Sequence, residues 1–297
     1  MRKIVLCLAA VAGMILSWNA SGQSFGALVY SGDARALAAG DAVFTTPDMA
    51  LSKIRADISY GMWQPYALNN NILDFNGRMS LGKSFGLHIG YRLNNIAAYE
   101  VVDENGNEKG TFDPSEHYFT AGVALRLADK IYVDVDGRFM TGSLAEGIST
   151  SAFATDITAR YSTESFTAGI RLANLGTTYT VSNVDYSLPL NVRAGGEYRL
   201  TFAGGDHCLA IGADIAYFLP ESYRSLMAGA SIEYNYDRMI FVRGGYRYSS
   251  AADKVPGFVS LGAGFRFKGV EFNAAYLLAS TGTPVSGSMI FGLAFAI

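Results

Sequence analysis

The sequence has little charge, and its charge has no dominant sign. Only 16% of the 297 residues are charged, and 23 Lys and Arg nearly balance 26 Asp and Glu, which gives a net charge of −3. A protein that binds nucleic acid usually carries a basic excess, so we do not expect nucleic acid as a partner. Low charge combined with 50% hydrophobic and 13% aromatic residues also excludes a disordered chain.

Long apolar runs are missing as well. No segment after the first residues approaches eighteen consecutive apolar residues, so the sequence predicts no membrane-spanning helix. It does contain 33 glycines, 18 tyrosines and 18 phenylalanines. Aromatic residues fit the pleated surface of a sheet, so this composition favours β structure.

The first 22 residues are predicted to form a signal peptide. Arg2 and Lys3 supply its positive start, and residues 4–16 form an apolar stretch that is too short to span a hydrocarbon core of about 30 Å. Small residues at 20–22 predict cleavage before Gln23. The alternative is an uncleaved membrane anchor.

Cysteine is nearly absent from the expected mature chain. Cleavage before Gln23 removes Cys7 and leaves 275 residues with Cys208 as the only thiol. One cysteine cannot form an internal disulfide bond, which excludes a disulfide-stabilised scaffold.

Apolar and polar residues alternate with period two through most of the chain. In residues 72–82, for example, Leu73 and Phe75 alternate with Asp74 and Asn76. An amphipathic helix would instead place its apolar residues three and four apart. The alternation predicts fourteen strands at residues 57–66, 72–84, 85–102, 115–128, 130–143, 152–162, 165–175, 189–202, 207–218, 225–236, 238–248, 257–267, 270–279 and 287–297.

The connections between these segments alternate in length. Short ones such as 83–84 and 268–269 alternate with longer ones such as 144–151 and 176–188. An even number of strands with short turns at one end and longer loops at the other is typical of outer-membrane barrels. The sequence therefore predicts an all-β fold, a 14-stranded antiparallel transmembrane β-barrel over residues 57–297.

Charged residues occupy only one phase of the predicted strands. The apolar phase carries no Asp, Glu, Lys or Arg. His117 is the one titratable exception on this phase. A charge that faces lipid near the bilayer centre costs about 2–4 kcal/mol, whereas a charge in the lumen can be hydrated or paired. We therefore expect the apolar phase to face lipid. A soluble protein that buries this phase is the alternative, because periodicity alone does not separate the two.

The lumen of so wide a barrel is either filled by another segment or open to water. Residues 23–56 precede the first strand, and an Ala- and Leu-rich stretch at 33–41 predicts a short helix that ends near Gly40. We expect this segment to be a plug that enters the lumen from the periplasmic end. A disordered periplasmic tail is the alternative.

Four stretches of the chain carry a family resemblance. Residues 103–116 read D-E-N-G-N-E-K-G-T-F-D-P-S-E, 138–147 read R-F-M-T-G-S-L-A-E-G, 172–176 read L-A-N-L-G and 188–196 read L-P-L-N-V-R-A-G-G. Together with the plug segment they resemble the PorV/PorQ family of FadL-like outer-membrane proteins of Bacteroidetes. The resemblance covers most of the mature chain.

Two functions are implied by this resemblance. PorV acts in the type IX secretion system, where it binds the C-terminal domains of cargo proteins at the outer-membrane translocon, so the first expectation is a protein-binding scaffold or shuttle. Relatives of FadL type pass hydrophobic small molecules, which requires an apolar lumen pocket and a lateral opening or kinked strand. The expected surroundings are the lipid bilayer and lipopolysaccharide.

The chain also departs from the family. Met49–Ser52 stands where an aromatic-Asn-Pro sequence usually follows the plug, and the outer loops are shorter than those of PorV. A shortened paralogue is therefore an alternative to a secretion factor.

No residue pattern points to catalysis, a cofactor or a metal. Asp206, His207 and Cys208 are adjacent, but neighbouring strand residues point to opposite faces. His88 and His117 add no metal-ligand spacing. The acidic start of residues 103–114 resembles a calcium loop, but it lacks the required glycine and glutamate, so an Asn-Gly turn is the preferred interpretation. We predict that the protein is not an enzyme.

Aromatic residues at the outer ends of the strands are the candidate partner-binding residues. An interfacial girdle is the default alternative for most of them. The lumen charges, in turn, either select solutes or form salt bridges between plug and wall, and their mixed signs favour the salt bridges. The six aromatic candidates are Trp63, Tyr66, Phe112, Tyr179, Phe218 and Tyr223.

Overall fold

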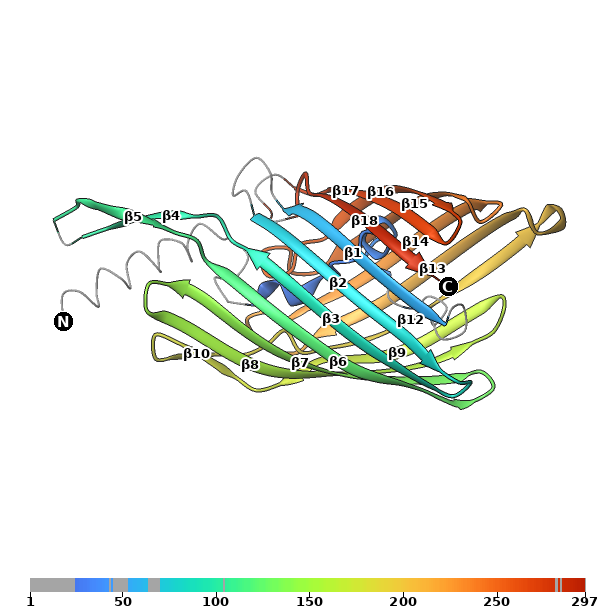
Figure 1. Cartoon of the computed structure of the whole chain (residues 1–297), viewed down its shortest axis with the longest axis horizontal. Coiled ribbons are helices and arrows are strands. Elements are labelled where there is room, and N and C mark those ends of the chain that lie inside the picture. The colour runs from blue at the N-terminus through green and yellow to red at the C-terminus, as the bar shows by residue number, and fades with distance from the viewer. Residues whose placement is uncertain are drawn as a thin grey trace.

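The chain forms one closed antiparallel β-barrel, shown in Figure 1. Fourteen of the described strands make up the wall, and the first of them pairs with the last, which closes the barrel. The predicted strand number and fold class are confirmed.

The expected signal peptide and Tyr66 lie outside the described residues. The computed structural model describes residues 25–42, 44, 53–63, 70–103, 105–280, 283 and 285–296.

The wall strands run antiparallel in chain order, interrupted only by two small hairpins. No described helix is long and apolar enough to cross a membrane. In chain order the wall consists of β1 (Ile54–Trp63), β2 (Asn70–Leu81), β3 (Phe85–Asn95), β6 (Ser115–Ala128), β7 (Ile131–Ala145), β8 (Ile148–Ser162), β9 (Phe166–Gly176), β12 (Asn191–Phe202), β13 (His207–Phe218), β14 (Ser225–Tyr236), β15 (Ile240–Ser249), β16 (Phe258–Phe267), β17 (Val270–Leu278) and β18 (Met289–Ala296).

Two hairpins lie outside the wall, and the sequence did not predict them. The predicted strand 85–102 is split, because β3 ends at Asn95 and β4 (Tyr99–Val102) leaves the barrel to pair with β5 (Glu108–Phe112). This hairpin projects beyond the wall (Figure 1). The second hairpin, β10 (Tyr179–Val181) with β11 (Val184–Tyr186), lies within the predicted loop 176–188. Alternation continues from β3 into β4, so periodicity does not show where the wall ends.

The prediction of a long loop at 144–151 is wrong. Strands β7 and β8 extend until only Glu146 and Gly147 connect them. Gly147 has φ +72°, a left-handed conformation that glycine adopts without steric cost. Ser and Thr residues near this turn are typical of loops, yet here they continue the strands. The wall is therefore taller at this hairpin than expected.

The apolar phase faces outward. Ile89 is 58% exposed and Leu261 is 56% exposed, whereas Arg243 on the opposite phase is 1% exposed. Large aliphatic and aromatic side chains cover the outer face of every wall strand in this way. Such a continuous apolar surface needs lipid around it. The alternative of a soluble protein with this phase buried is excluded.

Residues 25–42 occupy the lumen. Residues 25–42, here called the plug, contain a 3₁₀-helix, η1 (Gly26–Val29), and a short α-helix, α2 (Ala34–Ala38), drawn in blue inside the barrel in Figure 1. Asp33 caps α2 by accepting a hydrogen bond from the Arg35 N–H at 2.7 Å. The helix ends just before Gly40, as predicted.

We predict that an arginine on the outer face destabilises the barrel according to its depth. Leu261→Arg, near the middle of β16, should lower the free energy of unfolding by about 2–4 kcal/mol, and Leu278→Arg, at the outer end of β17, by about 0–1 kcal/mol. Reversible unfolding in phospholipid vesicles measures both. Equal costs for the two variants would contradict the assigned membrane position.

Candidate functional site

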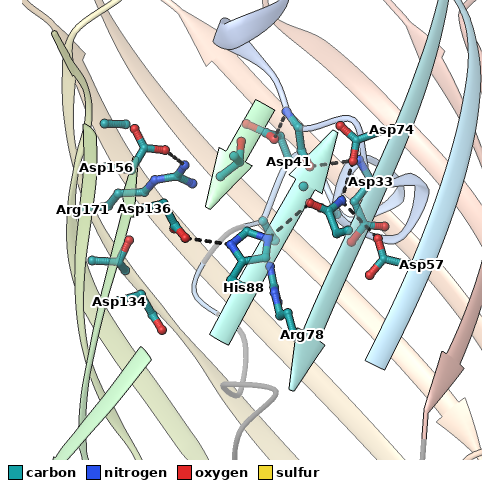
Figure 2. A pocket seen from close by; sticks show the side chains of 18 of the residues that line it. Asp33, Asp41, Asp57, Asp74, Arg78, His88, Asp134, Asp136, Asp156 and Arg171 are labelled. Carbon is teal, nitrogen blue, oxygen red and sulfur yellow. Dashed lines mark hydrogen bonds and ion pairs between the residues drawn. The ribbon is translucent and has the colours of Figure 1, made fainter. Parts of the chain in front are cut away.

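The plug divides the lumen into two halves. Helix α2 packs on β15 to β18 and on β1, and it fills the space beside those strands. On the other side of the plug lies a cavity bounded mainly by β2, β3, β6 to β9 and β12. Figure 2 shows that charged side chains from several of these strands converge on it.

The charges around the cavity are paired with one another. The His88 Nδ1 atom lies 2.7 Å from an Asp136 carboxylate oxygen, and Figure 2 shows the ring turned toward it. Arg92 donates to Asp74 at 2.5 Å, and Arg160 donates to Asp134. These pairs join neighbouring or nearby wall strands, so their first role is to neutralise charge enclosed by the barrel.

Asp156 is the centre of a larger network. It is 2% exposed and accepts hydrogen bonds from Arg171 at 2.6 Å and from Arg138 at 3.1 Å. The Asn174 N–H also donates to it at 2.7 Å. Asn174 has φ +59° and belongs to a β-bulge, where two β9 residues lie opposite Asp156 of β8.

Three of the stretches that carry the family resemblance meet at this bulge. Arg138 comes from the stretch 138–147 and donates to the Asn174 side-chain oxygen at 3.0 Å. Asn174 comes from 172–176, and its side-chain amide donates to the carbonyl of Pro189 at 3.1 Å. Residues from these stretches therefore belong to one hydrogen-bond network in the lumen.

Two wall arginines hold the end of helix α2. Arg247 donates to the carbonyl oxygen of Gly40 at 2.6 and 2.9 Å and to that of Asp41 at 3.1 Å. Arg193 donates to the Asp41 carboxylate at 3.0 Å. Asp214 on β13 pairs with both arginines. The positive groups lie where unpaired carbonyls follow the helix, which is a favourable arrangement.

Glycines in the wall let the plug approach closely. A Cβ atom on Gly245 of β15 would collide with the backbone of Ala39 and Gly40. A Cβ atom on Gly262 of β16 would collide with Ala38. Where the plug backbone touches β15 and β16, the inward-facing residues of these strands are glycines.

The Phe25 end of the plug, here called its outer end, has an apolar environment. The Phe25 ring makes edge contacts with Tyr118 and Tyr179, with ring centroids 5.8 and 5.0 Å apart. The pocket also includes Met140 and Leu188, and Phe25 is fully buried in it. The Phe25 ring occupies this pocket.

Tyr30 anchors the plug in a second aromatic cluster. Its ring stacks on Trp63 at 5.9 Å and meets the edge of Phe258 at 5.7 Å. Its hydroxyl donates to the carbonyl of Pro256. Burial raises the pKa of the Tyr30 hydroxyl far above its usual value, so it stays a neutral donor.

The structure buries most of the aromatic residues predicted from sequence to bind a partner. Trp63 packs on Tyr30, Tyr179 packs on Phe25, and Phe218 and Tyr223 lie in a third apolar cluster that contacts Tyr30. Their aromatic character is explained by contacts with the plug. Of the six, Phe112 lies on the projecting hairpin, where its ring contacts Tyr99.

The sequence analysis missed the plug residues that make these contacts. Phe25 and Tyr30 are large aromatic side chains in a segment otherwise rich in Ala, Gly and Ser, and this contrast was the available signal. Salt bridges between plug and wall were expected, and Arg193 with Asp41 is one, but the partners of Arg193 and Arg247 could not be named because they lie more than 150 positions away in the sequence. Among the described residues no three His, Cys, Asp or Glu side chains are grouped to hold a metal ion.

Solved structures with the same fold are transporters and channels. This chain aligns with the toluene transporter TbuX of Ralstonia pickettii at a TM-score of 0.59 and 11% identity, over 91% of this chain and 99% of that one. The toluene transporter TodX of Pseudomonas putida gives 0.58 and 12%, over 91% and 99%. The monoaromatic hydrocarbon channel CymD gives 0.60 and 13%, over 91% and 98%.

These likenesses establish the fold. No protein-family model matches the chain, and no curated protein matches it either. The structural likenesses confirm the predicted 14-stranded antiparallel barrel.

We predict that a larger residue at Gly245 displaces the plug. Gly245→Val places methyl groups where the Gly40 backbone lies, so the lumen should conduct ions in planar bilayers and the protein should unfold at a lower temperature. Gly244→Val is the matched control, because Gly244 is the next residue and a Cβ there meets only ordinary contacts. Conductance from both variants, or from neither, would contradict this plug position.

Proposed function

We propose that the protein is an outer-membrane channel for hydrophobic small molecules, closed at rest by its plug. The observation that carries the proposal is the Phe25 pocket, an apolar lumen site that holds one aromatic ring at the end where the loops are long. Long loops are extracellular in outer-membrane barrels, so the pocket lies on the side from which external solutes arrive. The solved structures of similar fold are described as toluene or monoaromatic hydrocarbon transporters, which supports the same class of solute.

The wall supplies the second feature that such a channel needs, a kinked strand. The β-bulge at Asn174 interrupts regular pairing between β8 and β9. Ala154 lies just beyond the bulge on β8 and also belongs to the Phe25 cluster. The kink is therefore close to the apolar pocket.

The polar cavity limits where an apolar solute can bind or pass inside the barrel. Apolar solutes gain nothing from a compartment whose walls are ion pairs. We infer that solute binding is confined to the apolar clusters around Phe25 and Tyr30 and that passage requires the plug to move.

We predict that Phe25→Ala increases the affinity for toluene. Removal of the ring leaves an apolar cavity, and such cavities bind benzene-sized molecules. We expect affinity to rise at least about tenfold, a difference of about 1.4 kcal/mol, because the competing ring is gone. Titration of the purified protein in nanodiscs, followed by NMR saturation transfer, measures it.

Phe44→Ala is the matched control. Phe44 is buried near Gly169, away from the Phe25 cluster. Phe44 belongs to none of the three clusters of buried apolar residues described above, so its truncation should not open an apolar cavity and should leave toluene binding unchanged. If Phe25→Ala binds no toluene while its barrel remains folded, the hydrocarbon-channel proposal is contradicted.

A protein-binding scaffold of PorV type is the second candidate, and the β4–β5 hairpin favours it. The hairpin extends beyond the wall, carries part of the 103–116 stretch and exposes Glu100, Val102 and Glu108. A two-stranded hairpin is only marginally stable by itself, so contact with another protein would stabilise it.

Replacement of residues 97–113 by a short Gly-Ser turn tests this candidate. If the hairpin recruits a type IX translocon or cargo C-terminal domains, gentle extraction should recover those proteins with the intact chain and lose them with the shortened one. Recovery of neither from the intact chain, or of both from the shortened chain, counts against the scaffold function.

A further inference from the structure

Glu116 accepts a hydrogen bond from the plug residue whose ring fills the apolar pocket. Its Oε1 atom accepts the Phe25 N–H at 2.7 Å, and its Oε2 atom accepts the Tyr118 hydroxyl at 2.6 Å and the Asn94 amide at 2.9 Å. Tyr118 belongs to both parts of the site, because its ring contacts the Phe25 ring and its hydroxyl donates to Glu116. The pocket therefore holds an aromatic ring together with a hydrogen-bond donor that points to a carboxylate.

This carboxylate depends on neutral donors. Glu116 is 2% exposed, and among the described residues the Phe25 N–H is the one donor to its Oε1 atom. A buried carboxylate that loses a hydrogen bond pays for the loss in free energy. When the plug moves, Oε1 loses this donor at the same time as the apolar pocket loses its ring. A ligand that takes the place of Phe25 must therefore satisfy both.

A second buried polar group at this end of the barrel is open to a ligand. Tyr223, in the loop between β13 and β14, is 1% exposed, and its hydroxyl has no hydrogen-bond partner among the described residues. Burial and then the charge of Glu116 raise the pKa of this hydroxyl well above its usual value, so it stays a neutral donor. Buried polar groups are normally hydrogen-bonded, so this hydroxyl is a donor available to a polar group of a ligand.

We propose that the ligand of the Phe25 pocket is a single-ring aromatic molecule that carries a hydrogen-bond donor, such as a phenol. Its ring takes the place of the Phe25 ring against Tyr118 and Tyr179, and its hydroxyl donates to Glu116 in place of the Phe25 N–H. A ring without a donor fills the same pocket but leaves the buried carboxylate without this bond, and sites built to bind a hydroxyl discriminate strongly against such analogues. This inference rests on the proposed channel function and specifies its solute.

The donor matters only when the whole of residue 25 is displaced. In Phe25→Ala the backbone N–H stays on Glu116, so toluene can fill the space of the ring without loss to the carboxylate. The toluene prediction for that variant therefore tests the proposed function and is independent of this inference.

Phenol and toluene are the probes, because a hydroxyl and a methyl group are similar in size. Each is titrated into the purified full-length protein in nanodiscs by NMR saturation transfer, with empty nanodiscs as the blank. The quantity compared between variants is the ratio of phenol affinity to toluene affinity. This comparison cancels the different hydration of the two free probes, and a general loosening of the plug changes both affinities alike.

We expect Glu116→Gln to lower this ratio at least about tenfold, because a hydrogen bond to a charged group contributes more than one to a neutral group. Phe25→Ala should lower it as well, since residue 25 keeps its N–H on Glu116. Asp185→Asn is the matched control, because Asp185 is exposed on β11 and accepts from Thr180, and it should leave the ratio unchanged. Heat-modifiable gel mobility checks that each barrel is folded.

The outcomes separate this inference from the proposed function. If toluene binds and the ratio is unchanged in either folded variant, the pocket takes plain hydrocarbons, so the inference is wrong while the channel proposal stands. The same holds if the unsubstituted protein binds neither probe and Phe25→Ala binds toluene, because the ligand then does not displace Phe25. If neither probe binds to any variant, the channel proposal itself is contradicted. Should Glu116→Gln fail to fold, the ratio in Phe25→Ala decides.

Discussion

The separation of charge from lipid is the constraint on which the rest of this structure depends. A charged side chain on the outer face costs free energy that increases with depth in the bilayer, so the charged residues of the spanning strands point inward. The barrel then encloses many charges, and a buried charge without a partner is expensive. The pairs His88–Asp136 and Arg92–Asp74, and the network around Asp156, follow from this condition. The lumen is polar because the outside is apolar.

The same constraint explains how the plug is held. Arginines that must point inward need acceptors, and the plug supplies the backbone carbonyls of Gly40 and Asp41 together with the Asp41 carboxylate. In return, wall arginines satisfy carbonyls that no helix bond uses. At the outer end the plug instead uses aromatic side chains, Phe25 and Tyr30, which pack on loop and wall aromatics. Hydrogen bonds and ion pairs therefore hold the plug at Gly40 and Asp41, whereas ring contacts hold it at Phe25 and Tyr30.

Much of the fold could be predicted from the sequence because the lipid boundary acts on every residue of a strand. Strand number, the outward phase and the short plug helix follow from local pattern. The hairpin at Tyr99–Phe112 and the tight turn at Gly147 could not be predicted, because alternation looks the same inside and outside the wall and Ser and Thr serve in both loops and strands. The mixed lumen charges predicted salt bridges between plug and wall, but the residues that pair were beyond prediction for another reason. Arg247 and Gly40 are more than 200 positions apart, and nothing local in the sequence marks them as partners. The buried places of Tyr179, Phe218 and Tyr223 depend on the same long-range packing.

The family resemblance has a structural explanation that bears on function. Glu116, Arg138, Asn174 and Pro189 come from all four of the stretches that carry it, and each takes part in a lumen contact that seats the plug or shapes the bulge. These residues would serve a channel and a scaffold alike, because both need a closed barrel with an ordered plug. The features that separate the two functions lie elsewhere, in the apolar pocket around Phe25 and in the β4–β5 hairpin. The pocket is apolar and holds an aromatic ring of the plug, whereas the hairpin offers only exposed strand edges. The geometry therefore gives more support to a small hydrophobic ligand than to a protein partner.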